Sequence, residues 1–273
     1  MITDINPFLL TDGYKVGHHK MYPKATTLVY TNFTPRSYKY APKGCDKLIV
    51  FGSQLTIKVI YESFHNNFFN KPKGDVISEI KKEYSLYLGY DYDTSHIERL
   101  WDLKYLPIRV KSLPEGTKVG MGVPVLTIVN THPDFFWITN FLETIISNLL
   151  WKPMTSATLA YFFNKDIIQK YAKLTDKNNE FTKFQAHDFS MRGMDSPFAV
   201  IASGLGHSLS FLGSDSLPVI YGARKYYNAT EGVIHSVNAT EHSIMSSNTA
   251  NIKAIIEETG QYDGFVIDDY YGE

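Results

Sequence analysis

Two short polar segments in the second half of the chain combine residue types that could bind a flat ring bearing polar groups. The first is His187 to Gly193 (HDFSMRG), in which Phe189 offers an aromatic face and Arg192 a cation. The second is Gly213 to Asp215 (GSD), whose carboxylate can accept a hydrogen bond from an NH2 group. Aromatic faces stack on flat rings, and guanidinium groups form charge-assisted bonds with phosphate oxygens. These segments are therefore the first candidates for a ligand-binding site.

Each of these residues also has an ordinary structural interpretation. Apolar side chains such as Phe189 most often belong to a core. Asp215 precedes a helix predicted to begin at Ser216, and Asp is among the best N-terminal helix caps. Arg192 and a second candidate cation, Arg36, could be solvated surface arginines. Residue type alone leaves both interpretations open.

His242 is a candidate for covalent chemistry. It follows Glu241 at the start of a helix predicted at about Ser243 to Glu258. A neutral imidazole is a nucleophile toward a phosphoryl group, and a helix N-terminus would stabilise the phosphate it received. A lone histidine is more often a cap or a surface residue. His187 more simply orients its loop by hydrogen bonding.

The elements that must position these residues fall into two parts, with a domain boundary predicted near residue 150. Residues 1–150 are predicted to form an α+β domain with an antiparallel sheet. Its strands are expected at Thr26–Phe33, Lys47–Phe51, Pro107–Ser112 and Lys118–Val129, and its helices at Ser53–Phe69, Asp75–Leu88 and Pro133–Trp151. Pro153 is expected to break the last helix.

Residues 151–273 alternate predicted helices with predicted strands. Helices are expected at Thr155–Leu174, Pro197–Leu212, Ser216–Tyr227 and Ser243–Glu258, and strands at Lys183–Phe189, Val233–Val237 and Gly264–Ile267. Such alternation predicts a parallel α/β arrangement with its site at the strand ends. The fold class is therefore α/β: an α+β domain followed by the first part of an irregular α/β barrel that is apparently incomplete.

Composition narrows the function classes. The chain has 273 residues, of which 44% are hydrophobic, and a net charge of −1, so nucleic acid is not an expected partner. Cys45 is its only cysteine, which excludes an internal disulfide and a thiolate metal cluster, and no metal-binding residues are predicted. The N-terminus does not resemble a signal peptide, and no apolar run approaches the roughly 20 residues of a membrane span. A soluble, cytoplasmic protein is expected.

Seven segments together resemble the nicotinamide phosphoribosyltransferases, members of the type II phosphoribosyltransferase family. They run in the family's order and spacing over almost the whole chain, and they are Thr11–Pro23 (TDGYKVGHHKMYP), Tyr30–Arg36, Phe51-Gly52, Leu113–Gly116 followed by Thr139–Trp151, HDFSMRG, GSD, and Thr240–Ser243 (TEHS). The resemblance implies transfer of a phosphoribosyl group from phosphoribosyl pyrophosphate to nicotinamide, giving nicotinamide mononucleotide and pyrophosphate in NAD salvage. This chain would be the N-terminal part of such an enzyme.

The resemblance also implies roles for the ring-binding candidates. Phe189 would stack on one face of nicotinamide. Tyr14 would cover the other face from the second subunit of a homodimer, although without the family a surface tyrosine is the simpler interpretation. Asp215 would accept a hydrogen bond from the nicotinamide amide. A carboxylate at this position repels the carboxylate of nicotinic acid, and so favours the amide.

The charged candidates take further roles from the resemblance. Arg192 would lie beside the base and the ribose-phosphate, and Arg36 near the pyrophosphate end. His242 would be phosphorylated by ATP, an activating co-substrate that drives the reaction toward product. Mg²⁺ would accompany pyrophosphate.

The chain departs from the family at its end. Family members continue for roughly as long again, and the loops for the ribose and the 5′-phosphate lie in that later part. Asp268-Asp269-Tyr270-Tyr271 replaces the family's Ser-Asp-x-Tyr-Asp pattern. A truncated gene, a frameshifted end, or a split gene with a separate C-terminal half would each explain this. Two alternatives remain: a nicotinate phosphoribosyltransferase, which Asp215 opposes, and a non-catalytic fragment acting as a binding or interaction module.

Overall fold

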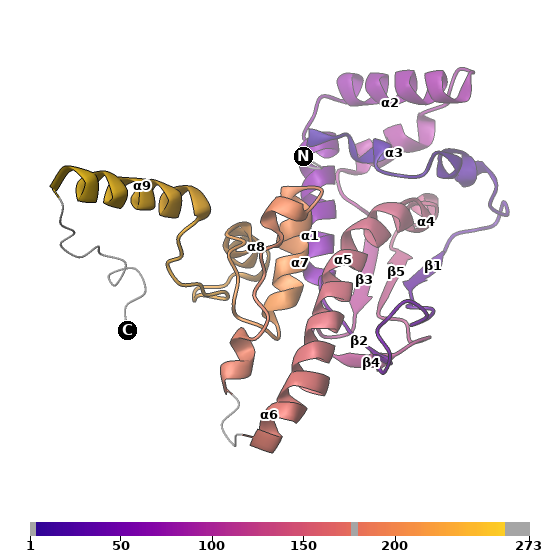
Figure 1. Cartoon of the computed structure of the whole chain (residues 1–273). Helices are drawn as coiled ribbons and strands as arrows, with labels where there is room; N and C mark the ends of the chain where they lie inside the picture. Colours follow the sequence, from indigo (N-terminus) through magenta and orange to yellow (C-terminus); the bar gives the residue numbers. More distant parts are fainter. Residues whose placement is uncertain (1–3, 176–179, 260–273) are drawn as a thin grey trace. The chain divides into compact units, whose positions relative to one another are not determined.

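The computed structural model describes residues 4–175 and 180–259 of the chain (Figure 1). Contacts group the chain into two units, Met1–Ile234 and His235–Glu273. The site loops around Phe189 and Asp215 belong to the first unit, and His242 belongs to the second.

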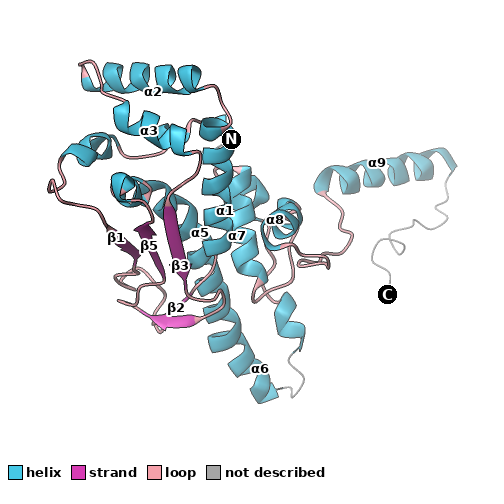
Figure 2. Ribbon diagram, turned by 180° about the vertical axis from the view of Figure 1, so that it is seen from behind, coloured by secondary structure: helices cyan, strands magenta, loops and turns pink. Residues whose placement is uncertain are grey.

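A small antiparallel sheet forms in the first unit, as the sequence predicts. Strand β5 (Leu126–Asn130) lies between β1 (Tyr30–Phe33) and β3 (Ile108–Ser112), and Figure 2 shows the three strands side by side. Ile128 of β5 pairs with Thr31 on one side and with Val110 on the other. Strands β2 (Lys47–Ile49) and β4 (Lys118–Gly120) form a second antiparallel pair. The predicted strand at residues 26–29 is absent, because pairing with β5 begins only at Tyr30.

Three helices follow the apolar periodicity of the first hundred residues. They are α1 (Ser53–Phe64), which continues as a π-helical turn to Phe69, α2 (Lys73–Leu88), and α3 (Ser95–Leu103), which the sequence analysis did not predict. Phe8 is fully buried at the centre of an aromatic cluster, 4.9 Å from Phe68 and 5.2 Å from Phe141 between ring centroids. This cluster joins the N-terminal segment to α1 and to the helices after the sheet.

The long helix α5 (Glu143–Tyr161) follows the short α4 (Ile138–Phe141). A later helix, at residues 197–208, packs against it. It contains Pro153, so the prediction that this proline ends the helix is wrong. The Pro153 ring lies against Gly52, where a Cβ atom would come within 2.4 Å of it. On the other side, a Cβ atom at Gly206 of α7 (Pro197–Ser208) would come within 2.5 Å of the Pro153 carbonyl oxygen. The buried packing on both sides offsets the single hydrogen bond that proline removes.

The remaining helices of the first unit are α6 (Gln169–Thr175), reached from α5 through a π-helical segment (Phe162–Ile168), and α8 (Pro218–Tyr227). Helix α7 packs on both α5 and α8, as Figure 1 shows. Residue 150, the predicted domain boundary, lies inside α5, and the compact first unit continues to Ile234.

The parallel strands predicted after residue 150 do not form in the described part of the chain. Residues 180–184 form a 3-10 helix, and from the predicted strand Lys183–Phe189 only Asp188 pairs, in a parallel bridge to Ser214. Other backbone groups there bond to loops: the Lys183 carbonyl accepts from the Leu212 N–H. Of the predicted strand Val233–Val237, only His235 makes a β-bridge; Ile234 is buried, whereas Val237 is exposed. The predicted strand 264–267 lies outside the described residues. The chain is thus a mixed α/β protein with small antiparallel sheets.

The second unit contributes one described helix, α9 (His242–Thr259). It begins one residue earlier than predicted. Among the helices of the described residues, none is long and apolar enough to cross a membrane.

Candidate functional site

Two loops that are far apart in sequence meet at the candidate site. The Asp188 N–H donates to the Gly213 carbonyl (3.0 Å), and the Asp215 N–H donates to the Asp188 carbonyl (3.0 Å). This two-bond parallel bridge aligns the HDF segment with the GSD turn. The two segments that the sequence singled out are therefore brought together by backbone pairing.

The Asp188 side chain holds the two loops in register. Its Oδ1 accepts from the Ser190 N–H (2.9 Å), and its Oδ2 accepts from the Ser214 hydroxyl (3.2 Å). Burial by itself raises the pKa of Asp188, but the hydrogen bonds it accepts from Ser190 and Ser214 outweigh it and leave the pKa below its usual range. Asp188 thus stays ionised as an internal brace.

His187 and Asp215 form the polar edge of the site. The His187 Nε2 lies 3.0 Å from the Asp215 Oδ1, and both side chains are partly exposed. The His187 ring lies over Gly213, where a Cβ atom would come within 2.7 Å of Nδ1. Only glycine leaves room for the ring there. With Nε2 protonated, His187 donates to Asp215 and fixes the direction of that carboxylate.

Phe189 presents an exposed aromatic face beside this pair. Its ring centroid lies 4.5 Å from that of His187, and 63% of the residue is exposed. Such exposure is unusual for a core phenylalanine, so the core interpretation of Phe189 does not hold in this chain. Arg192, also exposed, follows in the short 3-10 helix Ser190–Gly193, which leads into α7. The arrangement offers a ring face, an acceptor and a cation on neighbouring stretches of backbone.

The helix-capping interpretation of Asp215 fits less well. Helix α8 begins at Pro218, and its N-cap residue is Leu217, which makes no side-chain cap hydrogen bond. The Asp215 carboxylate instead engages His187.

Three other predicted residues lie on different elements. Tyr14 is exposed on the 3-10 helix η3 (Gly13–Lys20), where its ring packs edge-on against His18 at 5.2 Å. Arg36 is exposed just after β1. Among the described residues, no ring contact joins Tyr14 to Phe189. His242 is the exposed first residue of α9 in the second unit, and the neighbouring Ser243 hydroxyl donates to the Glu241 carboxylate.

Sequence reasoning missed the residues that hold the site together. Asp188 lies inside the HDF motif, but no role was assigned to it. His207 of α7 places its Nε2 3.2 Å from the Ala186 carbonyl, and burial lowers the pKa of this histidine. A neutral His207 can thus donate to that carbonyl and fix the HDF loop to α7. The HDF motif is the sequence signal that could have identified Asp188, whereas His207 lies among apolar residues of its helix, outside any motif.

Comparisons with known proteins bear on this site. Residues 6–84 match the family model for the nicotinamide phosphoribosyltransferase N-terminal domain. The chain is 44% identical over 246 residues to the nicotinamide phosphoribosyltransferase of Acinetobacter baylyi, an alignment covering 88% of this chain and 48% of that protein. It is 29% identical over 247 residues to that of Xanthomonas campestris pv. campestris, covering 89% and 49% respectively. The resemblance inferred from the motifs is thereby confirmed.

A solved structure supports the fold. The crystal structure of human nicotinic acid phosphoribosyltransferase matches with a TM-score of 0.55 at 20% identity, covering 87% of this chain and 40% of that one. At this identity the likeness concerns the fold alone. The chain spans about half the length of the curated relatives it matches.

Proposed function

We propose that this chain, being similar to nicotinamide phosphoribosyltransferases over most of its length, forms the nicotinamide-binding part of such an enzyme. The reaction transfers the phosphoribosyl group of phosphoribosyl pyrophosphate to nicotinamide. The ring nitrogen forms a bond to C1′ of the ribose, the bond from C1′ to pyrophosphate breaks, and pyrophosphate leaves with the electron pair. No proton needs to move. The protein therefore acts by orienting both reactants and balancing the phosphate charge.

The observation that carries this proposal is the exposed Phe189 ring beside the His187–Asp215 pair. A stacked nicotinamide on Phe189 would have its ring face covered and an acceptor at its edge. The His187 bond occupies one side of the Asp215 Oδ1, and a carboxylate has about four acceptor positions in total. A carboxylate can accept several hydrogen bonds at once, and the proposal assigns Asp215 one from an amide N–H.

The same geometry opposes the nearest enzymatic alternative, a nicotinate phosphoribosyltransferase. A second carboxylate placed at the amide position would face Asp215 at close range, which costs free energy in a partly desolvated site. A non-catalytic binding module remains the other alternative. It would bind the ring without forming nicotinamide mononucleotide.

The charged residues complete the proposal. Arg192 would contact the ribose-phosphate of the same site, and Arg36 the pyrophosphate end. The described residues include no cluster of three or more His, Cys, Asp or Glu side chains placed to hold a metal, so Mg²⁺ would arrive bound to pyrophosphate oxygens. ATP would phosphorylate His242. The exposed position of this imidazole at the start of an 18-residue helix fits that role, because the helix N-terminus favours a phosphate.

The proposal includes an assembly. Tyr14 would reach the ring site of a second subunit in a homodimer, since it does not meet Phe189 within its own chain. The relatives extend about as far again, and the barrel with its ribose and phosphate loops is assigned to that further part, on a separate chain or on the same one. A cytoplasmic location belongs to the same proposal.

A reconstitution assay tests the proposal. The 273-residue chain is mixed with the C-terminal half of the Acinetobacter relative, and nicotinamide mononucleotide is measured by mass spectrometry with phosphoribosyl pyrophosphate, Mg²⁺ and ATP present. We expect product from the mixture, and less from nicotinic acid than from nicotinamide. A mixed complex that forms, binds nicotinamide and makes no product would favour the binding module, and faster turnover of nicotinic acid would favour the nicotinate enzyme.

A further inference from the structure

Tyr14 lies on a short helix whose own hydrogen bonds do not fix the direction of the Tyr14 side chain. Helix η3 is a 3-10 helix of eight residues, and 3-10 helices of this length are uncommon because their hydrogen-bond geometry is poor. Tyr14 is 64% exposed, so core packing does not fix its ring either. The direction of this side chain must come from contacts that its neighbours make.

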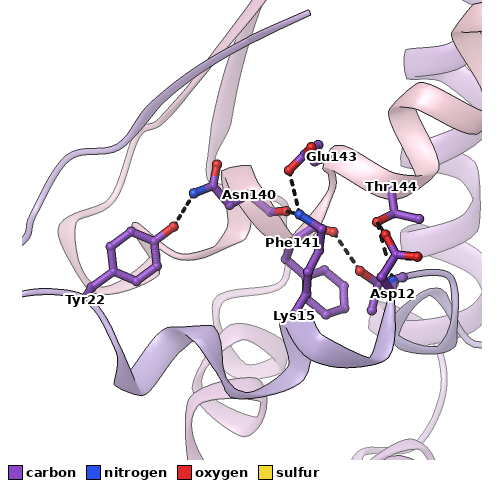
Figure 3. Close-up of polar contacts among 8 residues, drawn as sticks. Asp12, Lys15, Tyr22, Asn140, Phe141, Glu143 and Thr144 are labelled. Carbon is purple, nitrogen blue, oxygen red and sulfur yellow. Dashed lines mark hydrogen bonds and ion pairs between the residues drawn. The ribbon is translucent and has the colours of Figure 1, made fainter.

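Lys15 makes the principal contact of this kind. Its side chain is only 3% exposed, and its Nζ donates to the Glu143 Oε2 (2.6 Å) and to the Asn140 carbonyl (3.0 Å). Glu143 is the first residue of α5, and Asn140 belongs to α4. Figure 3 shows the Lys15 ammonium pointing into the junction of these two helices. The junction thus supplies both a carboxylate and a helix-end carbonyl to one buried cation.

Residues on both sides of Tyr14 bind the same junction. The Thr11 hydroxyl donates to the Phe141 carbonyl (3.1 Å). The Thr144 hydroxyl donates to the Asp12 carboxylate (2.6 Å), a contact that Figure 3 shows. The backbone on either side of residue 14 is therefore fixed to α4 and α5. The side chain of Tyr14 projects from it into solvent.

The Lys15 ammonium also acts on the Tyr14 ring directly. Its Nζ lies 5.3 Å from the ring centroid, within the range of a cation–π interaction, and the His18 ring packs edge-on at 5.2 Å. Because Glu143 and Asn140 fix the ammonium, the cation favours one orientation of the ring. An exposed lysine would move with the ring and could not do this.

We propose that Lys15, fixed by Glu143 and Asn140, is a positioning residue that orients the Tyr14 ring for the nicotinamide site of a second copy of this chain. The orientation of Tyr14 concerns this chain alone. Its consequence for nicotinamide rests on the proposed function. Lys15 touches no substrate in this proposal, and it acts only through Tyr14.

Fluorine NMR tests the orientation on the 273-residue chain itself, with 3-fluorotyrosine placed only at position 14. The unmodified sequence should give one narrow resonance. Lys15→Met should broaden or shift it, because the ring then samples several orientations, and Lys15→Arg should restore most of the line shape. Lys20→Met is the matched control: Lys20 lies on the same helix and pairs with Asp93 at 3.6 Å, with both side chains exposed. It should leave the resonance unchanged.

Two results would overturn the orientation. One is an unchanged resonance in a folded Lys15→Met chain, and the other is an equal change in Lys20→Met. If Lys15→Met fails to fold, Glu143→Gln replaces it, because this change removes the charge and keeps a hydrogen-bond acceptor. We expect a changed resonance from Glu143→Gln with an unchanged circular dichroism spectrum.

Kinetics of the reconstituted enzyme test the consequence. Lys15→Met should raise the KM for nicotinamide about five- to tenfold, the scale of one partly desolvated cation–π contact, and leave the KM for phosphoribosyl pyrophosphate within about twofold. In a Tyr14→Ala background the same change should add nothing. If Lys15→Met raises the KM by the same factor with and without Tyr14, its effect does not pass through the Tyr14 ring. That result would show a merely structural role and overturn the proposal. If the unaltered mixture makes no product, the proposed function fails, while the fluorine spectra still decide the orientation of Tyr14.

Discussion

At the scale of single residues, the exposed ring of Phe189 is expected to supply much of the affinity for nicotinamide. Phe189→Ala should weaken nicotinamide binding by about 1–3 kcal/mol, the magnitude of one lost aromatic stack with its buried area. Calorimetric titration of the reconstituted enzyme measures this. Because Phe189 is 63% exposed without ligand, the thermal midpoint should hardly change. Phe184→Ala, at a 52% exposed phenylalanine of the same segment, is the control that should keep full affinity.

The carboxylate of Asp215 is expected to decide between the amide and the acid. Asp215→Ser should lower the ratio of kcat/KM for nicotinamide to that for nicotinic acid, because it removes the acceptor for the amide and the repulsion of the acid. The circular dichroism spectrum should stay the same, since Leu217 rather than Asp215 occupies the N-cap position of α8. Asp195→Ser removes another exposed acid, two residues before α7, and should not alter the ratio. An unaltered ratio in Asp215→Ser would assign Asp215 a purely structural role.

At the scale of elements, a stacked pair of histidines, buried His96 and partly buried His19, joins η3 to α3. The His19 and His96 rings stack with centroids 3.6 Å apart and planes 10° apart, and Trp137 packs edge-on against His96 at 5.0 Å. Burial lowers the pKa of His96 to about 3, helped by the adjacent His19, whose own pKa burial also lowers. Both rings are therefore neutral at pH 7.

Acid is expected to loosen this contact. The unfolded chain protonates His96 near its ordinary pKa of about 6.5, whereas the folded chain resists protonation down to about 3. The contact should thus make its full contribution to the free energy of unfolding above pH 6.5. As the pH drops toward 3, the free energy of unfolding should fall by an amount on the order of a few kcal/mol. His96→Phe should show a smaller loss between pH 7 and 4 in urea titrations. His65→Asn, at an exposed histidine, should follow the original chain. Equal pH dependence in His96→Phe would disprove this account.

At the scale of the whole molecule, the separation of Tyr14 from Phe189 predicts complementation between subunits. Tyr14→Ala chains mixed with Phe189→Ala chains should regain part of the activity in the reconstitution assay. In a mixed two-fold dimer one site carries both changes and the other carries neither. The expected ceiling is about half of the original activity for each mixed dimer. Each altered chain alone provides the baseline, and activity no greater than the baselines would place both residues in one subunit's site.

The isolated chain is expected to bind nicotinamide without turning it over. The residues proposed to bind the ring, and His242, lie within the described part, whereas the residues that would hold the ribose and the 5′-phosphate are assigned by the proposal to the further part of the enzyme. A chain that does not anchor the phosphoribosyl donor loses the advantage of proximity, which can reach an effective molarity of ~10⁵ M or more. Saturation-transfer NMR should detect nicotinamide bound to the chain, and mass spectrometry should detect no mononucleotide. Robust synthesis by the isolated chain would contradict this prediction and the assignment of the phosphate site.

Much of the fold could be predicted from local patterns. The helices at Ser53–Phe69 and Asp75–Leu88 follow from apolar spacing, and the antiparallel strands around Ile108–Ser112 follow from β-forming residues between turns. These elements formed because one buried face suffices to stabilise each of them. The segment at Lys183–Phe189 had the residues of a strand but found a partner only at Asp188, and a strand needs a neighbour along its length.

The sequence by itself determined the residue types of the site and their order along the chain, and with them the family resemblance. Only the tertiary structure decided that His187 meets Asp215, 28 residues away, and that Asp188 braces both loops. It also decided that Lys15 is buried against Glu143, 128 residues away. Hydrogen bonds and ion pairs act over a few ångströms between side chains, and local sequence patterns do not encode which distant residues folding brings to that range.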